Sequence, residues 1–245
     1  MSNLPPVLLV PVLTELEWAI EPQIEEWTEV ASFDAPGVGD EPPAEAPTRR
    51  AIAERGIEEI ERRGWERCVV AGDEFGAVTA GVLASLVPER VAGLALGHAS
   101  LSLDTHGPRR PLTAEVLDTF ASMIRTSYRA YARALSQVTQ GAYGDDFVER
   151  YVERVPQEVA QGYADPLYTD LPEERLEESL RGLDVPMLLA EHRPCLMYTP
   201  EGFEDVTARF PEARTCTCVD KPSVSPDFVS ALHDLCAAIV SEDGS

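Results

Sequence analysis

The sequence has 245 residues, of which 44% are apolar, and it carries 20 basic against 43 acidic side chains, a net charge of −23. These values predict one globular domain with a sizeable core, and the charge excludes nucleic-acid backbones and anionic membranes as partners because both would be repelled. No stretch approaches the about 18 apolar residues of a membrane span. The start, Met1–Pro6, has no basic region or signal core. The five cysteines favour reduced thiols and a cytoplasmic protein over a disulfide framework.

Apolar runs alternate with helical patterns along the chain, which predicts a mostly parallel sheet with helices on both faces. The first run is Val7–Val10, which ends at Pro11, and the second is Val30–Phe33. The other predicted strands are Cys68–Ala71, Val91–Leu96, Met187–Ala190 and Cys216–Val219, and the predicted core helices are Thr48–Arg63, Ala77–Leu86 and one that begins near Ser225–Pro226.

The segment Val69–Ala77 is the most informative part of the sequence. It has the pattern of a buried strand, a tight glycine turn at Gly72–Gly76 and a following helix. Such a turn presents its central side chain at the edge of a sheet. That side chain is a carboxylate, Glu74.

Residues 105–181 interrupt the alternation of strands and helices. They contain amphipathic stretches, Ala114–Val138 and Phe147–Ala160, and no convincing strand. The sequence therefore predicts a helical cap at 105–181, inserted into a core made of residues 1–104 and 182–245. Its tyrosines, Tyr128 and Tyr131 among them, either line a ligand cavity or pack the cap helices together.

Three motifs in this order resemble those of the α/β-hydrolase superfamily. Asp34–Gly39 looks like the family's D-x-P-G-x-G turn, and Gly72–Gly76 looks like its nucleophile elbow. Val185–Ala190 resembles the V-P-x-L-L strand that leads to the acidic member of a catalytic triad. The resemblance covers nearly the whole chain and implies an α/β-hydrolase fold, a mostly parallel, doubly wound sheet with a helical cap insertion.

Each functional position of that family is altered in this sequence. Pro11–Val12 replaces the usual His-Gly, and proline has no N–H to give to an oxyanion hole. Glu74 replaces the serine. Relatives that attack epoxides or carbon–halogen bonds carry aspartate there, and glutamate reaches roughly 1.5 Å further, in a site where about 1 Å matters. No aspartate stands at the acid position after Leu189–Ala190, and His233 falls within the last helix pattern. The sequence predicts an atypical, triad-less member.

The candidates for chemistry are polar residues near the carboxyl ends of the predicted strands, where α/β sheets bind ligands. Glu74 is predicted to accept a proton, or else to be a structural carboxylate at a helix N-terminus. His98 and His192 each follow a strand and are predicted to act with it, His192 also as a pair with Glu191. Arg193 is predicted to pair with Glu74 or to bind a carboxylate. The predicted substrate contacts are Val12, Phe75, Glu191, Arg193, Tyr128 and Tyr131.

Three functions stay open at this point. The first is an enzyme of non-hydrolytic acid–base chemistry, the second a non-catalytic binding protein, and the third a hydrolase with a carboxylate nucleophile. No metal or cofactor is expected, because Cys216 and Cys218 share one side of a strand without further ligands near them in the sequence. The expected ligand is a small molecule or peptide, and a homodimer is left open. The lysine-poor composition suits a bacterium, and triad-less members of bacterial peptide natural-product pathways are an analogy.

Overall fold

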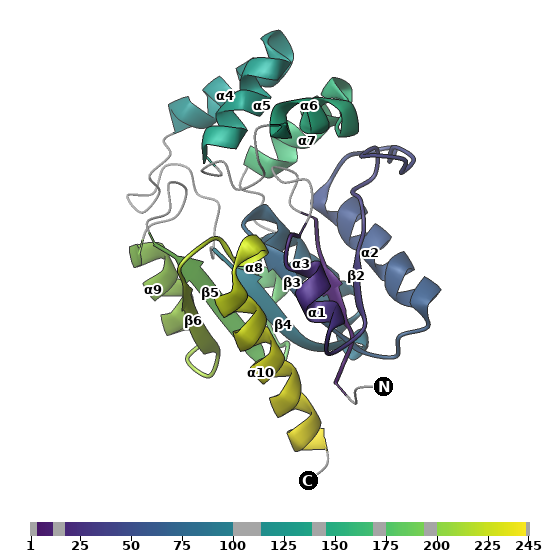
Figure 1. Cartoon of the computed structure of the whole chain (residues 1–245), viewed down its shortest axis with the longest axis vertical. Coiled ribbons are helices and arrows are strands. Elements are labelled where there is room, and N and C mark those ends of the chain that lie inside the picture. Colours follow the sequence, from purple (N-terminus) through teal and green to yellow (C-terminus); the bar gives the residue numbers. More distant parts are fainter. Residues whose placement is uncertain are drawn as a thin grey trace.

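The centre of the molecule is a six-stranded parallel sheet with strand order β2-β1-β3-β4-β5-β6 (Figure 1). The computed structural model describes residues 4–11, 18–99, 114–138, 146–168, 175–193 and 200–243. The strands are β1 (Val7–Leu9), β2 (Val30–Ser32), β3 (Cys68–Asp73), β4 (Val91–Gly97), β5 (Met187–His192) and β6 (Arg214–Cys218). All the predicted strands are confirmed.

Helices cover both faces of this sheet, and the pleat of each strand divides the core into two apolar clusters. Val69 and Ala71 face α1 and α10, whereas Val70 faces α2, α3 and α8. None of the described helices is long and apolar enough to cross a membrane. The helices are α1 (Glu21–Glu25), α2 (Arg49–Arg63), α3 (Phe75–Leu86), α4 (Ala114–Thr126), α5 (Tyr128–Val138), α6 (Phe147–Arg154), α7 (Gln157–Tyr168), α8 (Leu176–Ser179), α9 (Pro200–Arg209) and α10 (Pro226–Asp243), with short 3₁₀ turns η1 (Pro88–Arg90) and η3 (Pro222–Val224).

Helices α4 to α7 form a separate group at the end of the molecule opposite both chain termini (Figure 1). Each predicted amphipathic stretch is in fact two helices, which break at Ser127 and before Pro156. Proline at the second break removes a backbone donor. Aromatic rings hold this group together, because the rings of Tyr128 and Tyr131 on α5 lie 6.2 Å and 6.3 Å from the ring of Tyr151 on α6. The boundaries predicted for the cap stay predictions, because residues 104 and 105 lie outside the described part.

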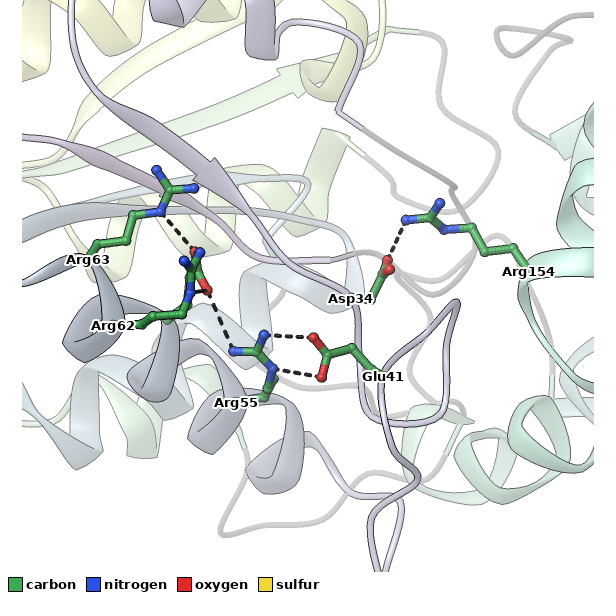
Figure 2. A network of polar contacts seen from close by, with 7 residues as sticks. Asp34, Glu41, Arg55, Arg62, Arg63 and Arg154 are labelled. Carbon is green, nitrogen blue, oxygen red and sulfur yellow. Dashed lines mark hydrogen bonds and ion pairs between the residues drawn. The ribbon is translucent and has the colours of Figure 1, made fainter.

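The loop after β2 attaches the core to these cap helices. Asp34 forms an ion pair with Arg154 of α6 at 2.7 Å, as Figure 2 shows. The Gly39 N–H donates to the carbonyl oxygen of Arg154 at 2.8 Å, and the Tyr163 hydroxyl of α7 donates to the carbonyl oxygen of Pro36 at 3.1 Å. The Asp34–Gly39 turn therefore fixes where the cap lies over the carboxyl ends of the strands.

Arg55, Arg62 and Arg63 lie beside that loop, as Figure 2 shows, and all three pair with one buried carboxylate on α2. Glu59 is 2% exposed and accepts hydrogen bonds from Arg62 at 2.5 Å and Arg63 at 2.8 Å, while Arg55 lies 3.7 Å away. Arg55 also binds both oxygens of Glu41. Burial would raise the pKa of Glu59, but the hydrogen bonds from Arg62 and Arg63 hold it below its ordinary value. The network joins the loop to α2 through charges that stay paired.

Candidate functional site

The chain turns sharply between β3 and α3. Glu74 has φ 50° and ψ −117°, a conformation that residues other than glycine rarely adopt. A Cβ on Gly72 would lie 2.2 Å from the carbonyl oxygen of Gly76, so only glycine fits there. The Glu74 N–H donates to the carbonyl oxygen of Gly97 at 3.0 Å and holds the turn against β4. This strand–turn–helix geometry places Glu74 at the carboxyl edge of the sheet.

The Glu74 side chain forms a buried ion pair with Lys221. Nζ of Lys221 lies 2.9 Å from Oε1 of Glu74, and the two residues are 7% and 4% exposed. Lys221 immediately precedes η3, and η3 packs against the end of β4, where a Cβ on Gly97 would lie 2.8 Å from Pro222. Charges so thoroughly removed from water are tolerated only when paired. Lys221 is therefore the partner that allows a carboxylate to be buried at this turn.

Three further titratable residues form a hydrogen-bonded chain at the same edge of the sheet. Nδ1 of His98 lies 2.8 Å from Oδ1 of Asp73, and Nε2 of His98 lies 2.6 Å from Nδ1 of His192. All three residues are buried. Among the described residues other than glycine, only Glu74 and His98 have positive φ, so the backbone strain lies directly after Asp73 and Gly97, the paired ends of β3 and β4.

The tautomers of His98 and His192 follow from a backbone N–H, because the position of its hydrogen is fixed. The backbone N–H of His192 donates to Nε2 of His98 at 3.2 Å, so that nitrogen is an acceptor. His98 in its neutral form then carries its proton on Nδ1 and donates it to Asp73. The contact between the two rings requires a proton on Nδ1 of His192. The basic lone pair of the chain is thus assigned to Nε2 of His192.

Nearby charges and burial set the protonation states of Asp73 and His192, the two ends of the hydrogen-bonded series. Burial, followed by the charge of His98, lowers the pKa of His192 to about 4. Burial alone would raise the pKa of Asp73, but His98, Lys221 and His192 hold it below its ordinary value. Oδ2 of Asp73 is buried and has no hydrogen-bond partner among the described residues. At neutral pH an ionised Asp73 therefore faces one end of the chain and a neutral His192 forms the other.

Comparisons with known proteins place this geometry in a structural class. No protein-family model matches the sequence, and no curated protein matches it. Solved structures do match over nearly the whole chain. A hydrolase from Oleispira antarctica is 16% identical, with a TM-score of 0.78, and the match covers 94% of this chain and 90% of that one. An enol-lactonase from Burkholderia xenovorans is 17% identical, with a TM-score of 0.74 and coverage of 98% and 92%.

The chain has the α/β-hydrolase fold. A thermophilic esterase from Thermogutta terrifontis gives the same result, at 18% identity, a TM-score of 0.73 and coverage of 97% and 91%. Within this α/β-hydrolase fold, Glu74 occupies the elbow position at which G-x-S-x-G enzymes carry serine.

The residue that faces the elbow of this α/β-hydrolase fold is one that the sequence analysis missed. Arg193 was predicted to pair with Glu74 or to bind a carboxylate, and it pairs with the carboxylate of Glu191 at 2.7 Å, whereas Lys221 pairs with Glu74. The sequence did contain a signal, because Lys221 is the only lysine in the chain. All the other permanently charged cationic side chains in the sequence are arginines. The single lysine lies at the elbow.

Asp73 is the second residue that was missed. Asp73 is the residue before the elbow position, and its side chain turns toward His98. The signal available was a carboxylate at the end of a wholly buried strand. Such a carboxylate needs a partner, and His98 follows the neighbouring strand β4.

His98 and His192 are brought together, but the predicted pair of Glu191 with His192 is wrong. β5 continues through His192, and successive strand residues point to opposite faces. His192 therefore lies on the same side as Ala190, facing α10, while Glu191 lies on the other side with Arg193.

The remaining predicted substrate contacts lie elsewhere or outside the described residues. Phe75 is 2% exposed and belongs to the apolar cluster on the α3 side of the sheet. The hydroxyl of Tyr128 donates to the carbonyl oxygen of Val155 at 2.6 Å, and the ring of Tyr131 lies 6.3 Å from that of Tyr151 on α6. These two tyrosines thus pack cap helices together, and their role in substrate binding stays a prediction. Val12 lies outside the described residues.

The described residues contain no group of three or more His, Cys, Asp or Glu side chains arranged to hold a metal ion. Sγ of Cys216 lies 3.7 Å from Sγ of Cys218, on the shared side of β6 that the sequence predicted. Burial raises the pKa of Cys218 to about 12, and both thiols are free. Cys68 and Cys236 are buried free thiols as well, and Cys195 lies outside the described part.

Proposed function

We propose that this protein is an atypical, triad-less α/β-hydrolase-fold enzyme that performs non-hydrolytic acid–base chemistry on a small molecule or peptide bound beneath the cap. Isomerisation, epimerisation, elimination and cyclisation all belong to this class. The observation that carries the proposal is the hydrogen-bonded chain from Asp73 through His98 to His192. The hydrolases of similar structure are too distant in sequence to lend this chain their reactions.

The hydrogen-bonded residues Asp73, His98 and His192 suit proton transfer, because His192 can accept a proton and Asp73 can stabilise the positive charge that results. His192 is neutral at pH 7 and offers a lone pair on Nε2, as a general base must. When Nε2 takes a proton, the proton on Nδ1 can pass to His98, whose own Nδ1 proton is already shared with Asp73. The positive charge then spreads toward a carboxylate and does not stay isolated in the core. The sequence predicted Glu74 as the base. We assign that role to His192, and we assign Glu74 to the buried ion pair with Lys221.

Deuterium exchange tests the proposal without knowledge of the product. The protein is incubated in deuterated buffer at pH 7 with carbon acids, namely aldehydes, ketones, 2-oxo acids and peptide thioesters, and deuterium uptake is followed by mass spectrometry. We expect uptake above the buffer rate, which His192→Gln lowers by about a hundredfold or more. His233→Gln is the matched control, because His233 lies on α10 against Trp27. Uptake that His192→Gln leaves unchanged would overturn the proposal.

A non-catalytic binding protein is the second candidate, and the Glu74–Lys221 pair favours it. That pair neutralises the elbow carboxylate inside the protein. Ligand binding seen by thermal shift, equal in the wild type and His192→Gln and without any deuterium uptake, would select this function. The third candidate, a hydrolase with Glu74 as nucleophile, would be selected by an ester trapped on Glu74 by an epoxide or alkyl halide.

We also propose a cytoplasmic bacterial setting in natural-product biosynthesis, with no nucleic-acid or membrane partner. The composition and the net charge of −23 support this setting.

A further inference from the structure

We propose that Lys221 is an amine nucleophile that binds aldehydes and ketones as an imine. The inference rests on the proposed function, because it names the substrate class on which His192 would act. An iminium ion acidifies the C–H bond next to the former carbonyl carbon, and that bond is the one a neighbouring base would break.

The cation opposite Glu74 is a lysine in a protein that otherwise uses arginine. The chain carries 20 Lys and Arg residues, and Lys221 is the only lysine among them. Arginine is always protonated in proteins and presents no nucleophilic lone pair, whereas a buried lysine can lose its proton. An arginine would serve as well or better if the position required only a permanent positive charge opposite Glu74.

A proton acceptor lies directly beside the Lys221 amine. Oε1 of Glu74 lies 2.9 Å from Nζ of Lys221, within direct proton-transfer distance. The elbow holds this carboxylate in a conformation of positive φ, so its position is fixed by the turn and by the hydrogen bond to Gly97. An acid–base partner fixed beside the amine is what imine formation needs.

The steps balance in atoms and charge. Glu74 takes a proton from the Lys221 ammonium, and the neutral amine attacks the carbonyl carbon. One of the two protons left on the nitrogen then moves to the former carbonyl oxygen, which gives a carbinolamine. Glu74 returns its proton to the departing hydroxyl, which leaves as water. The products are an iminium ion on Lys221, an ionised Glu74 and one water molecule, so the net charge of the pair is unchanged.

A base lies close to the Lys221 amine. η3 follows Lys221 directly and packs against β5, and a Cβ on Gly97 would lie 2.8 Å from Pro222 and 2.6 Å from Oδ1 of Asp73. The loop of Lys221 therefore lies beside Asp73 and the two histidines, and its charge contributes to lowering the pKa of both Asp73 and His192. With the iminium on Lys221 and the lone pair on His192, one site holds both parts needed to move a proton at carbon.

Reductive trapping tests the inference directly. The native protein is treated with propanal and sodium cyanoborohydride at pH 7 and digested with trypsin, and the peptide of residues 215–245, which contains the only lysine, is analysed by mass spectrometry. This peptide is separate from the N-terminal amine, the other primary amine of the chain. We expect one propyl adduct on Lys221 in the native protein, formed faster than in protein denatured in urea.

Two variants separate the outcomes. Lys221→Arg keeps the charge opposite Glu74 and should retain the fold while losing the adduct from this peptide. Glu74→Gln should slow the adduct relative to the wild type when both proteins are compared under conditions in which circular dichroism shows the variant to be folded, because the amine has lost its fixed proton acceptor. Labelling of Lys221 no faster in the native than in the denatured protein would overturn the inference. Deuterium uptake without the Lys221 adduct would support the proposed acid–base function and refute imine formation. The Lys221 adduct without deuterium uptake would support imine formation and refute the acid–base function.

Discussion

Lys221 and Glu74 neutralise each other inside the protein, although the elbow and the loop after β6 lie at distant points of the sequence. Each charge is therefore tolerable only while the other is present, since a buried charge without its partner is far less stable than a buried pair.

Removing one member of this pair should destabilise the fold strongly. Lys221→Met is expected to lower the free energy of unfolding by about 3–5 kcal/mol, because Glu74 is left buried without its cation. The double variant Glu74→Gln with Lys221→Met should recover most of that loss. Urea unfolding measures both.

The control for this experiment is an exposed pair on α2. Arg50 and Glu54 lie 2.9 Å apart with side chains 62% and 54% exposed. Arg50→Ala should change the unfolding free energy by less than about 1 kcal/mol. Equal effects of Arg50→Ala and Lys221→Met would contradict the interpretation of the elbow pair.

His192 should make stability depend on pH in a defined window. Its pKa is lowered from 6.5 to about 4 by burial and by His98, so between these values the unfolded chain binds more protons than the folded one. Stability is then complete above about pH 6.5 and falls as the pH drops toward 4, by about 3 kcal/mol in all. The lowered pKa of Asp73 adds a further loss at still lower pH.

Guanidinium unfolding from pH 4 to pH 7.5 checks this window, with His192→Gln as the variant that should flatten it. An NMR titration of the imidazole gives the pKa itself. A midpoint near the ordinary histidine value would refute the burial argument.

Gly72 and Gly64 should respond very differently to the same substitution. Gly72→Ala places a Cβ 2.2 Å from the carbonyl oxygen of Gly76, so the elbow must open, and we expect a loss of more than about 3 kcal/mol. Gly64 ends α2 with φ 67° and open space around it, so Gly64→Ala should cost only about 1 kcal/mol. Thermal unfolding of the two variants compares them, and similar losses would mean that the elbow is not tightly packed.

Asp73→Asn should disable proton transfer while keeping a side chain of the same size. The amide that replaces the carboxylate can donate to Nδ1 of His98, which favours the other tautomer and breaks the relay toward His192. Deuterium uptake should fall by about a hundredfold or more. Nitrogen NMR shifts of the two imidazoles report the tautomers, a readout that a purely structural role would leave unchanged. Asp146→Asn, on the exposed start of α6, is the matched control and should leave uptake as it is.

The sheet was predictable because its strands are continuous apolar runs, which only a doubly covered parallel sheet can bury. The apolar run that predicts β3 ends at Ala71, whereas the strand itself continues to Asp73. The end was missed because a polar residue at the end of a strand does not extend the apolar run. His98 and His192 were found because both follow strands that meet at one edge. Their contact with Asp73 was not predicted, because the position of a residue along a strand does not determine which side chain it contacts. Arg193 turned to Glu191, its near neighbour, and the elbow received its cation from a loop that only the folded sheet brings near.

The distance in sequence between Glu74 and Lys221 has a consequence for synthesis on the ribosome. β1 to β4 and the elbow emerge long before the segment that carries Lys221. Until then the nascent chain holds a carboxylate at a turn that is stable only when closed by a cation. The elbow should therefore lock late, when β6 and η3 have been released, and a chain arrested before Lys221 should expose this turn to proteases that the finished protein resists.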